Sequence, residues 1–256
     1  MTNLLSALEI DPPQILTIIG SGGKTSLMYA LAEEIQSRGQ RVITTTTTKI
    51  FPPKPEQSPE VILTDKPEDL ISRAAEALGK HRHITVAAGQ LDSGKLDSIK
   101  PELVGLLLAH TGSDVVIAEA DGSRGLPIKA PAIHEPVIPG LTDLVVPVVG
   151  LSGLGRPLDE ETVFRSEIFS DFSGIPMGQA ITADGIARAL FHPNGMLRRV
   201  GPGMRVIPIL NQADLVDASV ARAAAKALLA VGGDRIPKVV ITCLAKRPVE
   251  IQVVAR

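Results

Sequence analysis

Short apolar runs alternate along the chain with stretches in which apolar residues recur at helical spacing. The first run, residues 15–19, is mostly apolar, as expected for a strand that is buried on both faces of a parallel sheet. Apolar residues at helical spacing follow from Leu27 to Ile35, and Gly39 ends that pattern. The same order recurs several times, which predicts an α/β fold with a mostly parallel sheet.

The remaining elements follow from the same two patterns. Further strands are expected at residues 41–48, 61–64, 83–87, 114–118, 144–149, 204–210 and 236–241. Helices are expected at residues 67–78 and 100–110, around Phe164 and Phe169, and from Ala183 to just before His192. Because parallel strands need crossover connections, we expect helices to flank the sheet in a three-layer sandwich. At 256 residues the chain is predicted to form a single α/β domain, residues 1–256, with inserted loops and helices.

A glycine-rich segment, Gly20-Ser21-Gly22-Gly23-Lys24-Thr25, joins the first predicted strand to the first predicted helix. Such glycines let backbone N–H groups surround phosphate oxygens, the helix start adds partial positive charge, the lysine adds a full charge and the threonine can ligate Mg²⁺. The segment is a short form of the P-loop pattern, because Ile18 occupies the position of the first glycine. A glycine turn whose lysine stays in solvent is the alternative. We expect a P-loop NTPase-like nucleoside triphosphate site at Gly20, Ser21, Gly22, Gly23, Lys24, Thr25 and Ser26.

Five consecutive threonines, residues 44–48, end the second predicted strand. Their β-branched side chains favour extended backbone. The carboxyl ends of parallel strands form the ligand face of an open sheet, so Thr46 and Thr47 are expected near a terminal phosphate or Mg²⁺. A threonine-rich strand end without a ligand explains the pattern equally well.

Carboxylates follow the apolar strand predicted at residues 114–118. Glu119 and Asp121 point to the same side of an extended chain, so one can bind Mg²⁺ while the other positions water. In the loop that follows, Arg124 or Lys129 can neutralise phosphate charge. A strand that simply ends in an Asp-Gly turn is the alternative. The expected catalytic residues are Lys24, Glu119, Asp121 and Arg124, and the expected metal ligands are Thr25, Glu119 and Asp121.

A possible base-recognition motif, Asn211-Gln212-Ala213-Asp214, follows the strand predicted at residues 204–210. It resembles the N-K-x-D motif of P-loop GTPases, with Gln212 in the lysine position. A carboxylate at Asp214 can accept hydrogen bonds from guanine N1–H and its amine, whereas adenine offers no such pair. Asn211 and Asp214 are therefore expected to contact the base. The missing lysine leaves the choice between ATP and GTP open, with Mg²⁺ as the expected metal.

Composition excludes several classes of function. The net charge is -2 and no long basic run is present, so nucleic acid is not an expected partner. A single cysteine, Cys243, excludes an internal disulfide framework, and its apolar surroundings predict a buried thiol. No apolar segment approaches the roughly 20 residues of a membrane-spanning helix, and the N-terminal residues lack a secretory pattern. We expect a cytoplasmic protein without a membrane partner; its oligomeric state is open.

Several of these segments together resemble a known family. They are GSGGKT, the TTTTK stretch, VAAGQLDSGKL at residues 86–96, EADGSRGLPIKAP at residues 119–131 with HEPVIP after it, and VGLSGLGRPL at residues 149–158. Their order is similar to that of the selenium-dependent hydroxylase accessory proteins, the YqeC-type family. The resemblance implies a role in maturing selenium-dependent molybdenum hydroxylases, in synthesis or insertion of a selenium-containing cofactor. It also implies molybdenum cofactor or an apo-hydroxylase as partners.

The sequence therefore predicts a nucleoside triphosphate-binding accessory protein, with Mg²⁺-dependent hydrolysis as the expected reaction. Two other functions fit the same motifs. The first is an ATP-dependent ligase or kinase of a small molecule, because the G-x-x-G-K-T form resembles the loop of peptidoglycan-precursor ligases, although those ligases contain further domains. The second is a non-catalytic chaperone that binds nucleotide or cofactor and docks onto the hydroxylase.

Overall fold

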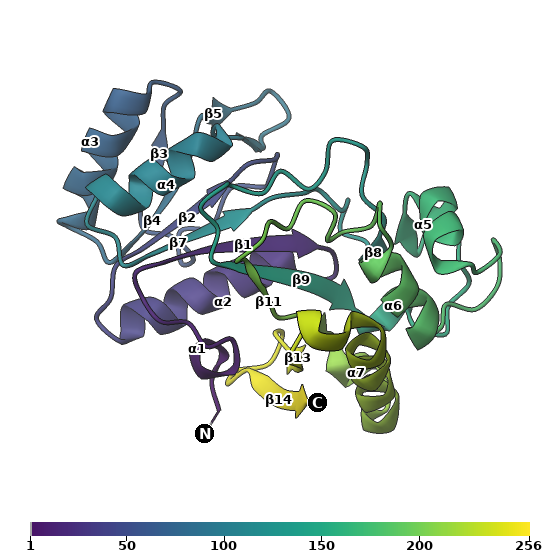
Figure 1. The fold of residues 1–256 in the computed structure, drawn as a ribbon. Coiled ribbons are helices and arrows are strands. Elements are labelled where there is room, and N and C mark those ends of the chain that lie inside the picture. The colour runs from purple at the N-terminus through teal and green to yellow at the C-terminus, as the bar shows by residue number, and fades with distance from the viewer. Residues whose placement is uncertain (1) are drawn as a thin grey trace.

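A ten-stranded sheet forms the centre of the computed structural model, which describes residues 2–256 (Figure 1). Its strands lie in the order β14 (Glu250–Ala255), β13 (Lys238–Cys243), β12 (Ile209–Asn211), β9 (Leu144–Gly150), β1 (Gln14–Gly20), β7 (Val115–Glu119), β2 (Val42–Thr46), β4 (His83–Ala87) and β3 (Val61–Leu63), and β11 (Arg205–Val206) also pairs with β9. Every pairing is parallel except that of β13 with β14. The expected α/β fold with a mostly parallel sheet is confirmed.

Helices cover both faces of this sheet. They are α1 (Leu4–Ala7), α2 (Lys24–Ser37), α3 (Pro67–Leu78), α4 (Pro101–His110), α5 (Ser166–Ser173), α6 (Ala183–Phe191) and α7 (Ala218–Gly232). Figure 1 shows α3 and α4 over one end of the sheet and α5, α6 and α7 at the other end. Among residues 2–256, none of the helices has the length and apolar character needed to cross a membrane.

The alternation of side chains along β1 explains the three layers. Leu16 and Ile18 point to one face of the sheet and belong to the apolar core that contains α1 and α2. Ile15 points to the other face and packs in the core with α3 and α4, and Ile19 packs on that face in the core with α6 and α7. Because successive strand residues point to opposite faces, a mostly apolar strand is needed where both faces are covered.

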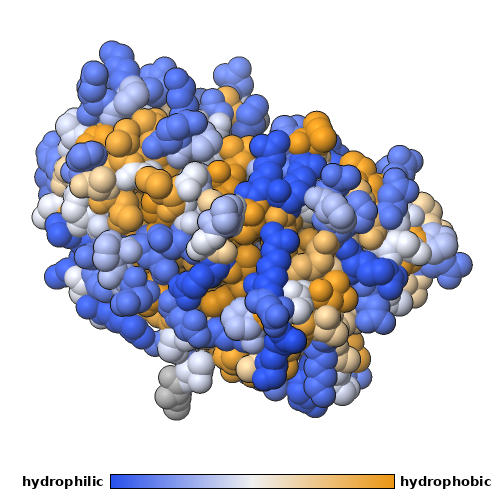
Figure 2. Space-filling model, in the orientation of Figure 1, coloured by the Kyte–Doolittle hydropathy of each residue, from blue (hydrophilic) through white to orange (hydrophobic). Residues whose placement is uncertain are grey.

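The outer surface is more polar than these layers. Hydrophilic residues cover much of the face shown in Figure 2, with smaller apolar areas between them. The most relevant exposed apolar side chain is Phe51, which is 68% exposed and is the one aromatic residue among the exposed large apolar side chains of the described chain. Phe51 lines a cavity.

The structure differs from the expected elements in three places. The strand expected at residues 204–210 is divided into β11 and β12, because Pro208 has no N–H to donate to the ladder. Phe164, expected in a helix, lies in the two-residue strand β10 (Val163–Phe164), which pairs with β8 (Ile128–Lys129). No strand was expected after residue 87, but the segment that follows forms a small hairpin of β5 (Gly89–Gln90) and β6 (Leu96–Asp97).

The sequence patterns did not predict α1, α7, β8 or β14. Helix α7 buries Ala221, Ala225 and Leu228 at helical spacing, so its sequence does carry an apolar stripe. Its small alanine side chains make that stripe weak. Strand β14 has a mostly exposed pattern and lies at the edge of the sheet.

The threonine run starts inside the sheet. The Thr44 hydroxyl lies 2.8 Å from the Thr85 hydroxyl and 3.0 Å from Nε2 of His83, and all three residues are fully buried. The Thr45 hydroxyl donates to the Val86 carbonyl at 2.8 Å. The hydroxyls of Thr44 and Thr45 therefore form hydrogen bonds to β4 inside the sheet. Nδ1 of His83 has no hydrogen-bond partner within the described residues.

Burial of His83 should make the protein sensitive to mild acid. Burial lowers the pKa of His83 from its ordinary value of 6.5 to about 4. As the pH falls, His83 becomes protonated near pH 6.5 in the unfolded chain but only near pH 4 in the folded chain. The free energy of unfolding is therefore highest above pH 6.5 and decreases as the pH falls from 6.5 to about 4. His83→Gln should remove about 3 kcal/mol of this pH dependence, measured by urea unfolding at pH 7.5 and pH 4. Equal pH dependence in both proteins would contradict the assignment.

Candidate functional site

The glycine-rich segment is packed tightly against the neighbouring strands. Gly20, Gly22 and Gly23 all have positive φ, at 98°, 74° and 129°, a region that residues with a Cβ rarely adopt. A Cβ on Gly22 would also overlap the backbone of Gly150 at the end of β9, and one on Gly23 would overlap the Asn211 side chain. The glycines are therefore required both by their backbone conformation and by space.

Helix α2 begins at this segment without a cap. Its N-cap residue, Gly23, provides no side-chain hydrogen bond, and the Leu27 N–H is the first to bond back, to the Gly23 carbonyl at 2.9 Å. The first-turn N–H groups before Leu27 therefore have no acceptor in their own helix. Lys24, Thr25 and Ser26, which carry those groups, line a cavity of about 640 Å³. Uncapped N–H groups and the positive end of the helix dipole form an anion-binding site.

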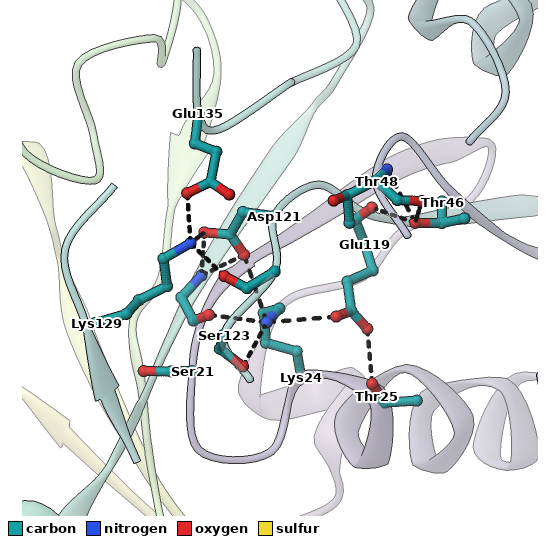
Figure 3. Close-up of polar contacts among 12 residues, drawn as sticks. Ser21, Lys24, Thr25, Thr46, Thr48, Glu119, Asp121, Ser123, Lys129 and Glu135 are labelled. Atoms are coloured by element: carbon teal, nitrogen blue, oxygen red, sulfur yellow. Dashed lines mark hydrogen bonds and ion pairs between the residues drawn. The ribbon is translucent and has the colours of Figure 1, made fainter. Parts of the chain in front are cut away.

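Lys24 does not extend into solvent. Its residue is 4% exposed, and its Nζ donates to the Gly20 carbonyl at 2.8 Å and to the Ser123 hydroxyl at 3.3 Å. The same atom lies 3.3 Å from Oε1 of Glu119 and 3.5 Å from Oδ1 of Asp121 (Figure 3). Burial lowers the pKa of Lys24, but the two carboxylates outweigh burial and the net pKa is raised. The ammonium group therefore remains charged inside the protein.

Thr25 and Glu119 meet at the carboxyl ends of adjacent strands. Glu119 is the last residue of β7 and pairs in register with Ile18 of β1. The Thr25 hydroxyl donates to Oε2 of Glu119 at 2.8 Å (Figure 3). A hydroxyl and a carboxylate at this distance offer hard oxygen ligands of the kind that Mg²⁺ prefers beside phosphates. Among residues 2–256, no group of three or more His, Cys, Asp or Glu side chains could hold a metal alone.

Asp121 is engaged entirely within the protein. It is fully buried, both of its carboxylate oxygens accept from the Gly20 N–H at 3.0 Å, and Oδ2 lies 3.1 Å from Nζ of Lys129. Lys129, which the sequence placed near phosphate, is buried and pairs with Glu135 at 2.8 Å. Its charge therefore serves Asp121 and Glu135. The expectation that Asp121 binds metal or water stays a prediction, and its observed contacts are those of a structural ion pair.

Glu135 extends this series of charges to Arg165, the residue before α5. Its Oε2 accepts from Lys129 at 2.8 Å and from Arg165 at 2.7 Å. Burial raises the pKa of Glu135, but hydrogen bonds from Arg165 and Lys129 outweigh burial and the net pKa is lowered to about 2. Positive and negative groups thus alternate in one network, buried except at Arg165 and made of Glu119, Lys24, Asp121, Lys129, Glu135 and Arg165.

A cavity of about 640 Å³ opens beside this network. It is within the size range of small-molecule sites. Its lining contains five cationic side chains, Lys24, Lys49, Lys95, Arg124 and Arg165, against the two carboxylates of Glu119 and Glu135. A cavity with this excess of positive charge suits an anionic ligand.

Of the other residues expected near phosphate, Thr47 and Arg124 line the cavity and Thr46 does not. The Thr46 hydroxyl donates to the Glu119 carbonyl at 3.0 Å, and Thr46 is not part of the cavity lining. Thr47 does line the cavity, although its hydroxyl donates to the Val137 carbonyl at 2.7 Å. Arg124 is exposed at the cavity wall, and its role in neutralising phosphate stays a prediction.

The predicted base-recognition residues lie on the other side of the glycine segment. Nδ2 of Asn211 donates to the Gly22 carbonyl at 2.8 Å, and its Oδ1 accepts from the Thr242 hydroxyl and the Leu244 N–H, both at 3.1 Å. Asn211 therefore ties the segment to β13. Asp214 is exposed in a short 3₁₀ turn, Ala213–Leu215, and neither residue lines the cavity. Recognition of a base by Asp214 stays a prediction.

Several contributors to the site carried only weak signals in the sequence. Lys49 and Lys95 follow the strands expected at residues 41–48 and 83–87, and loops after parallel strands reach the ligand face of a sheet. Glu135 and Arg165 are far apart in the chain, so no local pattern shows that they pair. Cys243 is buried, as expected, and burial raises the pKa of its thiol.

Comparisons with known proteins agree with the motif order. The family model described as "YqeC protein" matches residues 16–167, a span that contains the glycine segment and the complete charge network. A protein of Escherichia coli (strain K12) described as "Uncharacterized protein YqeC" is 34% identical over 218 residues, which cover 81% of this chain and 81% of that protein.

Neutralising Asp121 should destabilise the protein, because two buried ammonium groups would lose their shared carboxylate. We expect Asp121→Asn to lower the free energy of unfolding by about 3 kcal/mol, the typical cost of breaking a buried ion pair on one side. Urea unfolding at pH 7.5 measures this change. The matched control is Glu76→Gln, which removes an exposed pair with Lys80 and should leave the midpoint unchanged. A shift in Asp121→Asn as small as that of the control would show that the network is not structural.

Proposed function

The chain belongs to the YqeC family, and we propose that it binds a nucleoside triphosphate together with Mg²⁺ at the start of α2. The observation that carries the proposal is the uncapped first turn of α2 beside the buried, charged Lys24. A charged ammonium and several free N–H groups converging on one cavity fit the terminal phosphates of a nucleotide.

Each side chain has a separate part in this proposal. The first-turn N–H groups hold phosphate oxygens, and Lys24 neutralises charge on the terminal phosphates. The Thr25 hydroxyl and the Glu119 carboxylate, 2.8 Å apart, would hold Mg²⁺ directly or through its water shell. The metal supplies charge neutralisation at the phosphates. Asp121 supports the site by fixing the Gly20 N–H and the Lys24 ammonium.

We further propose that the protein is an accessory factor in maturing selenium-dependent molybdenum hydroxylases. The support for this role is the resemblance of its motifs to that family. Mg²⁺-dependent hydrolysis of ATP or GTP would then accompany synthesis or insertion of the selenium-containing cofactor. A chaperone that binds nucleotide and apo-hydroxylase without turnover would show tight binding and no release of phosphate or diphosphate.

A ligase or kinase of a small molecule is the second candidate, and one observation favours it. The cavity extends from the first turn of α2 to Lys49, Lys95 and Arg124. These three cations add positive charge beyond that of Lys24 and the helix start. An enzyme that transfers a phosphoryl group or activates an acceptor must hold a second substrate at that place. Analysis of products for ADP together with a modified acceptor separates this function from simple hydrolysis.

Removal of the Lys24 charge should weaken triphosphate binding. In titration calorimetry with ATP or GTP and Mg²⁺, Lys24→Ala should bind about 10 to 100 times more weakly, as expected when a hydrogen bond to a charged group is lost. Lys80→Ala removes an exposed lysine on α3's C-terminal side and serves as the control. Unchanged affinity in Lys24→Ala would overturn the proposed phosphate site.

Thr25→Ala tests the metal position while leaving the charge network intact. We expect the gain in triphosphate affinity on adding Mg²⁺ to fall by about tenfold, because one oxygen ligand is lost. Affinity measured without Mg²⁺ should change little. If Mg²⁺ raises the triphosphate affinity of Thr25→Ala as much as that of the unmodified protein, Thr25 does not hold the metal.

A thermal-shift screen tests whether Asp214 reads the base. Ligands that bind only the folded protein raise its stability by mass action. We expect GTP to raise the melting temperature more than ATP or CTP, and Asp214→Asn to remove this difference. Asp217→Asn, another exposed carboxylate close by in the chain, is the matched control. Equal shifts for all three nucleotides would show that the base is not selected at Asp214.

A further inference from the structure

The direction of the bound triphosphate follows from the metal-holding pair. In nucleotide sites of this kind, the residues that would hold Mg²⁺ lie beside the last two phosphates. Thr25 and Glu119 therefore lie at the end of the triphosphate that carries the terminal phosphate. Glu119 is the last residue of β7. Strands β7 and β2 lie on one side of β1, whereas β9 and β12 lie on the other. Space on the β7 and β2 side is thus beyond the terminal phosphate.

Three further cations line the same cavity, each from a different segment, with Arg124 next to Phe164 of β10. Lys49 follows β2, Lys95 precedes β6 in the hairpin, and Arg124 lies in the loop after β7. None of them takes part in an ion pair within residues 2–256. The other cations of the cavity differ in this respect, because Lys24 and Arg165 are paired with buried carboxylates.

Two of the three cations are held by aromatic rings in place of carboxylates. Nζ of Lys95 lies 4.8 Å from the centroid of the Phe51 ring, and the Arg124 guanidinium lies 4.9 Å from that of Phe164. A ring face attracts a cation without neutralising it, so the side chain is oriented while its charge stays available. This arrangement also accounts for Phe51, which is 68% exposed at the cavity wall.

We propose that Lys49, Lys95 and Arg124 bind a second substrate of the protein, a small molecule that carries phosphate or carboxylate groups, beside the terminal phosphate of the nucleotide. The inference rests on the proposed nucleotide site, because that site fixes which end of the cavity is beyond the terminal phosphate. Three unpaired charges suit a ligand with at least two negative groups. Phe51 and Phe164 are positioning residues, which act through Lys95 and Arg124.

The test is titration calorimetry of protein saturated with Mg²⁺ and the β,γ-imido analogue of the preferred nucleotide, at fixed ionic strength. The probes are inorganic phosphate and malonate. We expect at least one probe to bind the saturated protein, and Lys49→Ala, Lys95→Ala and Arg124→Ala each to weaken it about tenfold. Phe51→Leu keeps every charge and should weaken the probe about threefold through Lys95 alone. Lys226→Ala, an exposed lysine on α7, is the matched control.

The results separate this inference from the proposed function. Binding of phosphate alone assigns a phosphate-bearing substrate, binding of malonate alone assigns a carboxylate-bearing one, and binding of both supports the site for either group. If neither probe binds the saturated protein, or if the three variants weaken the nucleotide as much as the probe, the second site is overturned while nucleotide binding stands. If the unmodified protein binds no triphosphate, the proposed function fails and this inference fails with it.

Discussion

The Lys24 ammonium lies between two buried carboxylates, and the geometry of the candidate site depends on that placement. Taking three charged groups out of water is costly, and only close pairing with added hydrogen bonds offsets the cost. Here Glu119 also accepts from Thr25, and Asp121 also accepts from the Gly20 N–H. The ion pairs therefore hold the glycine segment against β7. We infer that these buried charges serve to position the glycine segment, and that they add little net stability.

Strand order explains why the contributors meet. The segment after β1 lies between the ends of β7 and β9, because those strands are its neighbours in the sheet. Parallel strands bring their carboxyl ends to one edge, where ligands of open α/β sheets bind. β7 delivers Glu119, the end of β9 packs on Gly22, and β12 delivers Asn211, which bonds the Gly22 carbonyl. Residues that are distant in the chain thus become fixed contacts of a single turn.

The sequence predicted the parts of this site that depend on local pattern. Strand, glycine turn and helix are encoded within residues 15–39, and the apolar run before Glu119 places its carboxylate at a strand end. The partners of Asp121 could not be predicted in the same way. Its pairing with Lys129 depends on how the loop after β7 folds back, and that of Glu135 with Arg165 joins segments without a shared periodicity. Helix α7 was missed because alanine contributes little to an apolar stripe, and residues 204–210 were expected as one strand because the apolar run hides the effect of Pro208.

The alternating network has a consequence for how ligands bind. Its six charges, Glu119, Lys24, Asp121, Lys129, Glu135 and Arg165, sum to zero. If Lys24 turns to a phosphate, the carboxylates beside it lose part of their compensation, and a divalent cation near Glu119 restores it. Nucleotide and metal would then show thermodynamic reciprocity, with each raising the affinity of the other by the same factor. On this view the six-residue network is electroneutral, and it favours metal and nucleotide entering as a pair over either one alone.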